Sequence, residues 1–143
     1  MDLNSKKIGN ITEVESILAF LKLGCNVLQP YGDCERYDFV VDVDGALYKV
    51  QCKTSSTDNN GESIKFSCRS AHRVNGKCIN EKYTSKEVDF FCTTWNGKCY
   101  LIPQKDCFSR KTLRFTKPKN CQNDGIFFAE DYEIEKVLNS IRM

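Results

Sequence analysis

One β-hairpin constrains the fold of this chain more than any other part of the sequence. Two segments rich in β-branched and aromatic residues, 37–43 and 46–54, flank the dipeptide Asp44-Gly45, which favours a two-residue hairpin turn. With these two residues in the turn the register of the strands is fixed, and Asp38 faces Gln51. The sequence therefore predicts which side chains meet across the hairpin.

The predicted hairpin has an apolar face and a polar face, because side chains alternate along a strand. The apolar face, suited to a core, carries Tyr37, Phe39, Val41, Val43, Ala46, Tyr48, Val50 and Cys52. The polar face carries Asp38, Val40, Asp42, Leu47, Lys49, Gln51 and Lys53. Any half-buried sheet has polar residues on one face, but this does not require a carboxylate, an amide and an ammonium group to converge. We therefore expect a functional site at Asp38, Gln51 and Lys53.

Two segments, residues 12–23 and 131–141, have the apolar spacing of helices. In the first, Asn10 or Thr12 is expected to cap the start, which places Glu13 in the first turn. The side chains expected to face the core are Val14, Ile17, Leu18 and Leu21 in the first helix and Ile134, Val137, Leu138 and Ile141 in the second.

Further strands are expected at 25–29, 64–68, 88–95, 98–102 and 113–116, with hairpin turns at Asn75-Gly76 and Asn96-Gly97. Strands of this kind between two helices predict an α/β fold, a central mixed sheet flanked by the N- and C-terminal helices. A length of 143 residues is typical of one domain, so residues 1–143 are expected to form a single unit.

The polar face of the hairpin suits metal-dependent hydrolysis of phosphodiesters. Asp38 through its carboxylate, Gln51 through its amide oxygen and Cys52 through its carbonyl are candidate ligands for Mg²⁺, or for Mn²⁺. Lys53 is the candidate for holding the attacking water and offsetting charge on the phosphate.

Two side-chain ligands, one of them neutral, make a weak site for a divalent ion. A further carboxylate is therefore expected, and Glu13 on the first helix is the candidate. Glu15 is the alternative, although it points about 200° away on a helical wheel. The single histidine, His72, stands beside Arg73, so a solvated or phosphate-contacting role is favoured over metal binding.

Positive charge is concentrated in one part of the chain. Residues 64–119 contain thirteen Lys and Arg against four Asp and Glu, whereas the remainder has eight against fifteen. A basic segment of this kind suits a polyanionic partner, although a solvated lysine-rich surface is the alternative. The candidate DNA-binding residues are Lys49, Arg69, Arg73, Lys77 and Lys98.

The nine cysteines are odd in number and include no Cys-x-x-Cys pair. They are interpreted as reduced packing residues of a cytoplasmic protein, with a disulfide framework as the alternative. The sequence has no apolar run long enough to span a membrane, and its N-terminus lacks the apolar core of a signal peptide. Trp95 is expected to pack within its hairpin, and Asp42 and Lys49 are expected to form at most a surface ion pair.

These motifs resemble the PD-(D/E)XK nuclease superfamily. The likeness is carried by Gly9-x-x-x-Glu13, Tyr37-Asp38 and Gln51-Cys52-Lys53, and less specifically by Val88-Asp89-Phe90-Phe91, Tyr100-Leu101-Ile102-Pro103 and Ala129-Glu130-Asp131-Tyr132. It is similar to the branch of group I intron homing endonucleases, with archaeal Holliday junction resolvases next. The resemblance implies a restriction-endonuclease-like core in which Glu13, Asp38, Gln51 and Lys53 are catalytic. Gln51 stands where most of the superfamily has an acid, a variant also found in the intron endonuclease branch.

The expected function is therefore metal-dependent cleavage of DNA. Cutting both strands of a duplex requires two active sites, so a homodimer or higher homo-oligomer is expected. The alternatives are a structure-selective resolvase, a catalytically silent DNA-binding module in which Gln51 marks a decayed metal site, and an interaction domain with no role on nucleic acids.

Overall fold

The hairpin lies in the middle of the sheet in the computed structural model, which describes residues 3–120 and 124–142. Strands β2 (Phe39–Val43) and β3 (Ala46–Cys52) pair antiparallel with the predicted register, from Phe39 opposite Val50 to Val43 opposite Ala46. Asp44 and Gly45 have φ angles of 53° and 95°, the left-handed conformation that a tight hairpin turn of this kind requires. The hairpin prediction is confirmed.

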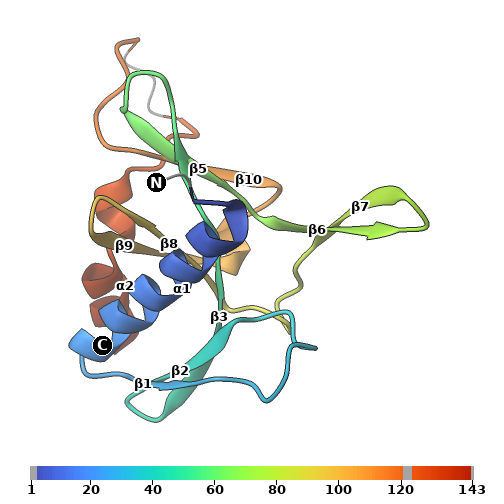
Figure 1. Ribbon diagram of the computed structural model, residues 1–143. Coiled ribbons are helices and arrows are strands. Elements are labelled where there is room, and N and C mark those ends of the chain that lie inside the picture. Colours follow the sequence, from blue (N-terminus) through green and yellow to red (C-terminus); the bar gives the residue numbers. More distant parts are fainter. Residues whose placement is uncertain (1–2, 121–123, 143) are drawn as a thin grey trace.

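The central sheet has five strands and is mixed. Its order is β1-β2-β3-β8-β9, where β1 is Asn26–Leu28, β8 is Phe90–Trp95 and β9 is Lys98–Pro103. The pair β3 and β8 is parallel, and the other neighbours are antiparallel. Helices α1 (Ser5–Lys22) and α2 (Ile134–Arg142) lie beside this sheet (Figure 1), so the predicted α/β architecture is confirmed.

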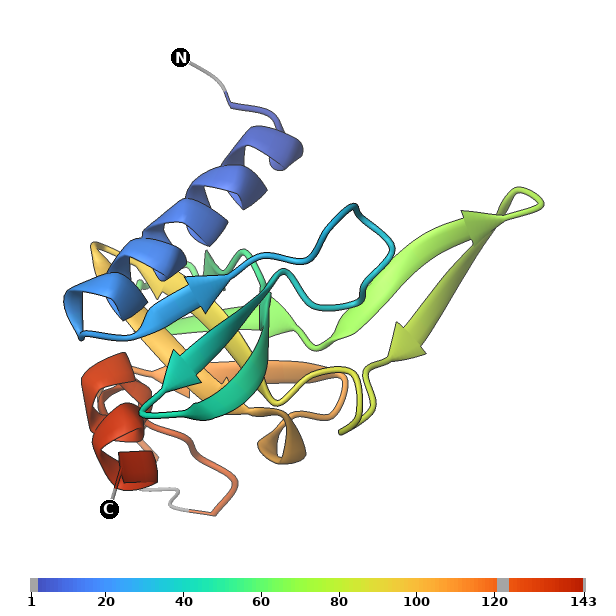
Figure 2. The ribbon, with the colours of Figure 1, turned by 90° about the horizontal axis from the view of Figure 1, so that it is seen from below.

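The remaining strands form a small sheet and a ribbon. The small sheet has the order β10-β5-β4, with β4 at Ser56–Thr57, β5 at Ser63–Ser67 and β10 at Arg110–Arg114. The ribbon consists of β6 (Arg69–Val74) and β7 (Lys77–Lys82), joined by the predicted Asn75-Gly76 turn. Both views show this ribbon projecting away from the body of the protein (Figures 1 and 2). Two short 3-10 helices, η1 (Gln104–Asp106) and η2 (Ala129–Tyr132), complete the described elements.

The two faces of the central sheet contribute to two apolar clusters. One cluster joins α1 and α2 to the sheet through Phe20, Val50, Leu101 and Leu138. The other contains Phe91, Tyr100 and Ile102 from the opposite face of β8 and β9, packed with Ile64 and Leu113 of the small sheet. The small sheet therefore covers one side of the central sheet, and the ribbon leaves the body directly after β5.

The first helix differs from the prediction in its start. It begins at Ser5, and the Asn4 side chain caps it by accepting a hydrogen bond from the Lys7 N–H at 3.0 Å. Glu13 consequently lies in the middle of the helix and not in its first turn, so its carboxylate gains nothing from the helix dipole. The predicted start at Asn10 or Thr12 is wrong because an earlier Asn provides the cap.

The predicted apolar stripe of this helix faces the core only at Ile17, which packs against the first apolar cluster. Val14, Leu18 and Leu21 are exposed, and the buried side chains are Thr12, Ser16 and Phe20. The Ser16 hydroxyl donates to the Thr12 carbonyl at 2.7 Å, which satisfies the hydroxyl within the helix. Small polar residues on the buried side let the helix lie close to the sheet. Because these residues are polar, the spacing of apolar residues does not identify this side as the buried one.

Other boundaries shift modestly. Strand β10 begins at Arg110 and ends at Arg114, so the predicted strand 113–116 starts too late and runs on too far. The C-terminal helix starts at Ile134 after η2, three residues later than predicted. No helix in the described ranges 3–120 and 124–142 is long and apolar enough to cross a membrane.

Candidate active site

Asp38 lies directly before β2, and its side chain turns toward the backbone of β3. Its Oδ2 accepts a hydrogen bond from the Cys52 N–H at 2.7 Å, and its own N–H donates to the Val50 carbonyl at 2.8 Å. These contacts continue the hairpin by one residue beyond the strand and hold the carboxylate beside the Gln51-Cys52-Lys53 segment. The structure thus brings Asp38 to the place predicted from the hairpin register.

Gln51 and the carbonyl of Cys52 lie next to each other. The Gln51 Nε2 donates to the Cys52 oxygen at 3.4 Å, a distance at which an amide hydrogen bond is weak. A cation bound by the Cys52 carbonyl and the Gln51 Oε1 would replace this contact at little cost. Two oxygen ligands of the kind that hard divalent cations take are therefore adjacent.

Glu13 approaches the same place from α1. Its carboxylate is half-buried, and its pKa is raised above the ordinary value of 4.5 by desolvation and then by the charge of Asp38. The pKa of Asp38 is raised above 3.8 mainly by burial, although the Cys52 N–H and Lys53 counteract this. Two carboxylates that repel each other in a partly desolvated place form a site that a cation stabilises.

Glu15, the alternative ligand, is exposed on another side of α1. Within residues 3–120 and 124–142, no three His, Cys, Asp or Glu side chains cluster in a way that could hold a metal ion. The candidate donors near Asp38 are instead two carboxylates, one amide oxygen and one backbone carbonyl. This mixed oxygen set fits a divalent ion such as Mg²⁺ or Mn²⁺, with fewer negative charges than a site with an acid at position 51.

The Lys53 ammonium group is held at the base of the ribbon. Its Nζ donates to the Arg69 carbonyl and to the Tyr83 hydroxyl, each at 3.1 Å, and lies 4.9 Å from the centre of the Tyr83 ring. Because an ammonium group has three N–H donors, these contacts leave one donor available. Tyr83 was not predicted from the sequence, where it reads as an ordinary residue after a strand.

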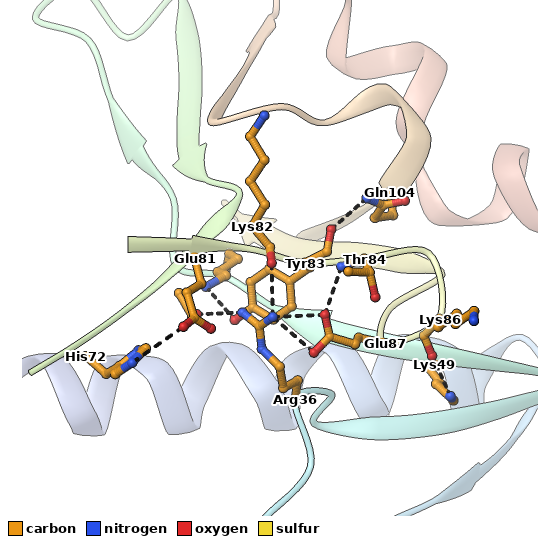
Figure 3. Close-up of polar contacts among 12 residues, drawn as sticks. Arg36, Lys49, His72, Glu81, Lys82, Tyr83, Thr84, Lys86, Glu87 and Gln104 are labelled. Carbon is orange, nitrogen blue, oxygen red and sulfur yellow. Dashed lines mark hydrogen bonds and ion pairs between the residues drawn. The ribbon is translucent and has the colours of Figure 1, made fainter. Parts of the chain in front are cut away.

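A second unpredicted residue, Arg36, fastens the ribbon to the loop that leads into Asp38 (Figure 3). Its guanidinium group lies 4.2 Å from the centre of the Tyr83 ring and pairs with Glu87 at 2.9 Å. It also donates to the Ser70 hydroxyl at 2.6 Å and to the Lys82 carbonyl at 3.0 Å. The Arg36 side chain therefore contacts both strands of the ribbon, which fixes their base next to Lys53.

The predicted DNA-binding residues of the ribbon divide between its two faces. Arg73 lies opposite Cys78 and Lys77 opposite Val74, so their side chains point to opposite sides. Arg73 shares its side with Arg69 and Lys82, which are paired at the base. The Arg69 Nε is buried and has no hydrogen-bond partner within the described part of the chain. One face of the ribbon thus presents a line of basic side chains.

The other candidate DNA-binding residues lie apart from this line. Lys49 is half-buried and donates to the Lys86 carbonyl at 2.7 Å, so the expected ion pair with Asp42 does not form. Instead, Asp42 accepts from the Gly45 N–H in the turn. Lys98, beside α2, pairs with Glu133 at 3.1 Å.

Two further candidates from the sequence, His72 and Trp95, contact neighbouring side chains of the protein. The exposed His72 side chain lies 3.8 Å from Glu81 across the ribbon (Figure 3) and belongs to no metal-binding cluster among the residues described. Trp95 packs against the second apolar cluster, as predicted.

The eight described cysteines are free thiols, and Cys121 lies outside the described residues. Cys25, Cys68, Cys92, Cys99 and Cys107 are buried, whereas Cys34 and Cys78 are exposed. The Cys92 and Cys99 sulfur atoms lie 3.1 Å apart. Most of these thiols therefore pack within the protein, as predicted.

Comparison with known proteins adds two findings. A family model described as PD-(D/E)XK endonuclease matches residues 3–135. Among solved structures, a bacterial homing endonuclease, I-Ssp6803I, is similar with a TM-score of 0.78 and 24% sequence identity, covering 98% of this chain and 97% of that one. This likeness shows a shared fold over nearly the full length of both chains. No curated protein matches the chain.

Proposed function

Because the chain belongs to the PD-(D/E)XK endonuclease family, we propose that it hydrolyses DNA phosphodiester bonds with a divalent cation, Mg²⁺ or Mn²⁺. The observation that carries the proposal is the convergence of four side chains. Asp38 and Gln51 hydrogen-bond to the backbone of Cys52, the Lys53 charge lowers the pKa of Asp38, and burial and the Asp38 charge raise the pKa of Glu13. Neither the Asp38 nor the Glu13 carboxylate forms an ion pair within the described residues. The site therefore has negative charge that a cation would balance.

In this proposal the residues divide the work. Asp38, Glu13, the Gln51 amide oxygen and the Cys52 carbonyl would hold the cation, which when bound stabilises negative charge on the phosphate. Lys53 uses its remaining N–H donor to orient the attacking water and to stabilise a phosphate oxygen. Tyr83 and the Arg69 carbonyl position the Lys53 ammonium group, and Arg36 positions Tyr83.

The substrate in this proposal is double-stranded DNA. The ribbon is a two-stranded element of the size that fits a major groove, and its base contacts Lys53. DNA lying along the ribbon would pass beside its base, where the Lys53 ammonium group contacts the Arg69 carbonyl. Because the similar solved structure is described as a homing endonuclease, a homing-endonuclease-like activity on duplex DNA is the favoured form of this function. Cleavage of both strands would require at least two copies of the chain.

Plasmid cleavage tests the proposal. We expect nicking of supercoiled plasmid in the presence of Mg²⁺ or Mn²⁺, none with a chelator, and a loss of at least about 100-fold in rate for Lys53→Ala. Lys136→Ala, which removes an exposed lysine of α2 paired with Asp131, is the matched control and should cut at the wild-type rate.

Two outcomes would contradict this assignment. DNA binding without any cation-dependent nicking would favour a silent binding module, the alternative that Gln51 suggests. Cleavage of a four-way junction with no cleavage of linear duplex would favour a structure-selective resolvase.

A further inference from the structure

Two thiols meet where the small sheet joins the ribbon. Cys68 lies between β5 and β6, and its N–H donates to the Ser109 carbonyl at 3.0 Å, which continues the pairing of β5 with β10 by one residue. Cys107 comes directly after η1, two residues before Ser109. Both thiols line one pocket, and the Cys107 thiol is within hydrogen-bonding reach of the Cys68 sulfur. The fold thus brings together two cysteines that are distant in the sequence.

The shared pocket is wide enough to admit a small molecule. Its volume is about 240 Å³, several times the roughly 30 Å³ that one water molecule occupies in the liquid. The lining includes the exposed Lys105 and Phe108, so the pocket opens to solvent. Cys68 and Cys107 are themselves only 2% and 8% exposed. They therefore lie beside a space that a molecule as small as hydrogen peroxide can enter.

The two thiols differ in acidity. The hydrogen bond from the Cys107 thiol lowers the pKa of Cys68 below its ordinary value of 9.0, although burial opposes this, and the Lys111 and Lys53 charges lower it further. The same hydrogen bond and burial raise the pKa of Cys107. A thiolate is the form of cysteine that attacks an oxidant. Cys68 is therefore the sulfur that reacts first, with a protonated thiol beside it.

A second pair of thiols provides an internal comparison. The Cys92 and Cys99 sulfur atoms lie 3.1 Å apart across β8 and β9. If proximity alone decided which thiols become oxidised, this pair would form a disulfide. Cys92, however, is 0% exposed, and susceptibility to oxidation depends on access as well as on thiolate character. The two pairs therefore distinguish an open dithiol from a packed one.

From the shared pocket and the adjacent sulfur atoms we propose that Cys68 and Cys107 are a modification site for hydrogen peroxide, which converts them into a reversible disulfide. The Cys68 thiolate attacks one peroxide oxygen and the O–O bond breaks. Cys68 becomes a sulfenic acid, and the released hydroxide takes up the proton that Cys68 had lost. The Cys107 sulfur then attacks the Cys68 sulfur, the S–O bond breaks, and the Cys107 proton leaves with the hydroxyl group as a second water. Two thiols are oxidised, and one peroxide is reduced to two waters.

The disulfide would act on the residues that hold Lys53. Cys68 is bonded to Arg69, whose carbonyl accepts a hydrogen bond from the Lys53 Nζ at 3.1 Å. Tyr83, which provides the other acceptor, lines the same pocket. Drawing Cys68 into a bond with Cys107 shifts the Arg69 carbonyl, so the oxidised protein should cleave DNA more slowly. This consequence rests on the proposed function, whereas the formation of the disulfide does not.

Mass spectrometry of the full chain tests the modification. The protein carries Cys34→Ser, Cys78→Ser and Cys121→Ser, which removes the two exposed thiols and the one outside the described residues. After hydrogen peroxide under native conditions its mass should fall by two hydrogen atoms, peptide mapping should link Cys68 to Cys107, and dithiothreitol should reverse the change. A link between Cys92 and Cys99, or no link, would overturn the proposal.

A single substitution tests the order of the two steps. Cys107→Ser should stop the reaction at the sulfenic acid, so that dimedone labels Cys68. Cys25→Ser, at a buried thiol of the other apolar cluster, is the matched control and should still form the disulfide. Circular dichroism first establishes that each variant is folded. Labelling of any other cysteine in place of Cys68 would overturn the assignment of Cys68 as the reactive thiol.

Plasmid nicking measures the consequence and separates it from the proposed function. The oxidised protein should nick at least about tenfold more slowly than the reduced protein, because the Lys53 ammonium group is displaced, and dithiothreitol should restore the rate. The double variant Cys68→Ser with Cys107→Ser should nick at one rate with and without peroxide. A linked protein that nicks at the reduced rate would overturn the effect on Lys53. No nicking by any form would contradict the nuclease assignment, while the mass measurements would still decide the thiol pair.

Discussion

The substitution Asp38→Asn separates the two roles assigned to the Asp38 carboxylate. Asn keeps an oxygen that can accept the hydrogen bond from the Cys52 N–H, which in the wild type lies 2.7 Å from Asp38 Oδ2. It removes the negative charge that would bind a cation and that repels Glu13. Because the pKa of Asp38 is raised by burial, stability is lost as the pH rises from the ordinary pKa through the raised pKa of the folded protein, and the loss is complete at neutral pH. Without divalent ions at neutral pH, the variant should therefore be as stable as wild type or more stable, by about 0.5–2 kcal/mol.

Divalent cations should reverse this order. At a concentration about 100-fold above the dissociation constant, a cation that binds only the folded protein stabilises it by about 2.7 kcal/mol. For a chain of this length about 1 kcal/mol corresponds to roughly 2–4 °C in Tm, so wild type should gain about 5–11 °C. Asp38→Asn should gain almost nothing. The gain in wild type should also disappear as the pH falls, beginning above the ordinary pKa values of 3.8 and 4.5, because both carboxylates protonate more readily here.

Thermal melts followed by circular dichroism, in chelator and in Mg²⁺ or Mn²⁺, provide the measurement. Asp131→Asn, at an exposed carboxylate paired with Lys136, is the matched control and should respond to cations as wild type does. Equal stabilisation of wild type and Asp38→Asn by the cation would refute the assignment of Asp38 as a ligand. A large loss of stability by Asp38→Asn in chelator would show that the carboxylate charge is structural.

Three further predictions follow from single contacts. Tyr83→Phe removes one of the two acceptors that hold the Lys53 ammonium group. Plasmid nicking should slow by about tenfold, while the free energy of unfolding measured in urea should change by only about 1 kcal/mol. An unchanged nicking rate would contradict the positioning role of Tyr83. Arg73→Ala should lower DNA affinity and reduce the salt slope by about one, whereas Lys77→Ala on the opposite face should do neither, in binding titrations at several salt concentrations. Lys111 is 3% exposed and its pKa is lowered from 10.5 by burial, so the charged form is disfavoured in the folded protein. Wild type should therefore gain stability relative to Lys111→Met as the pH rises through the lowered pKa toward 10.5. A stability difference that stays constant with pH, in urea denaturation curves of both proteins, would contradict this.

The hairpin and the strands of the central sheet were predictable because the residues that determine them are neighbours in the sequence. Asp44-Gly45 adopts the left-handed conformation that its sequence favours, and period-two alternation then assigns each side chain to a face. The same local logic predicted the Asn75-Gly76 and Asn96-Gly97 turns. The placement of Asp38 opposite Gln51 follows from that register alone.

The helix and the surroundings of Lys53 were not predictable in this way. Apolar spacing selected the exposed side of α1, because the buried side is built from Thr12 and Ser16. Tyr83 and Arg36 reach Lys53 and the ribbon from segments that are distant along the chain. Contacts of this kind depend on how the ribbon packs against the sheet, and the residue periodicity of a single sequence does not predict them.

Both acceptors of the Lys53 ammonium group belong to the base of the ribbon, one on each side of it. The Arg69 carbonyl begins the first strand, and the Tyr83 hydroxyl follows the end of the second. The ribbon therefore holds at its base the two groups that position the Lys53 ammonium group, which itself follows β3, whereas its outer end at the Asn75-Gly76 turn projects away from the body of the protein. Under the proposed function, a tilt of the outer end on binding a duplex would move both acceptors together, and the Lys53 ammonium group with them.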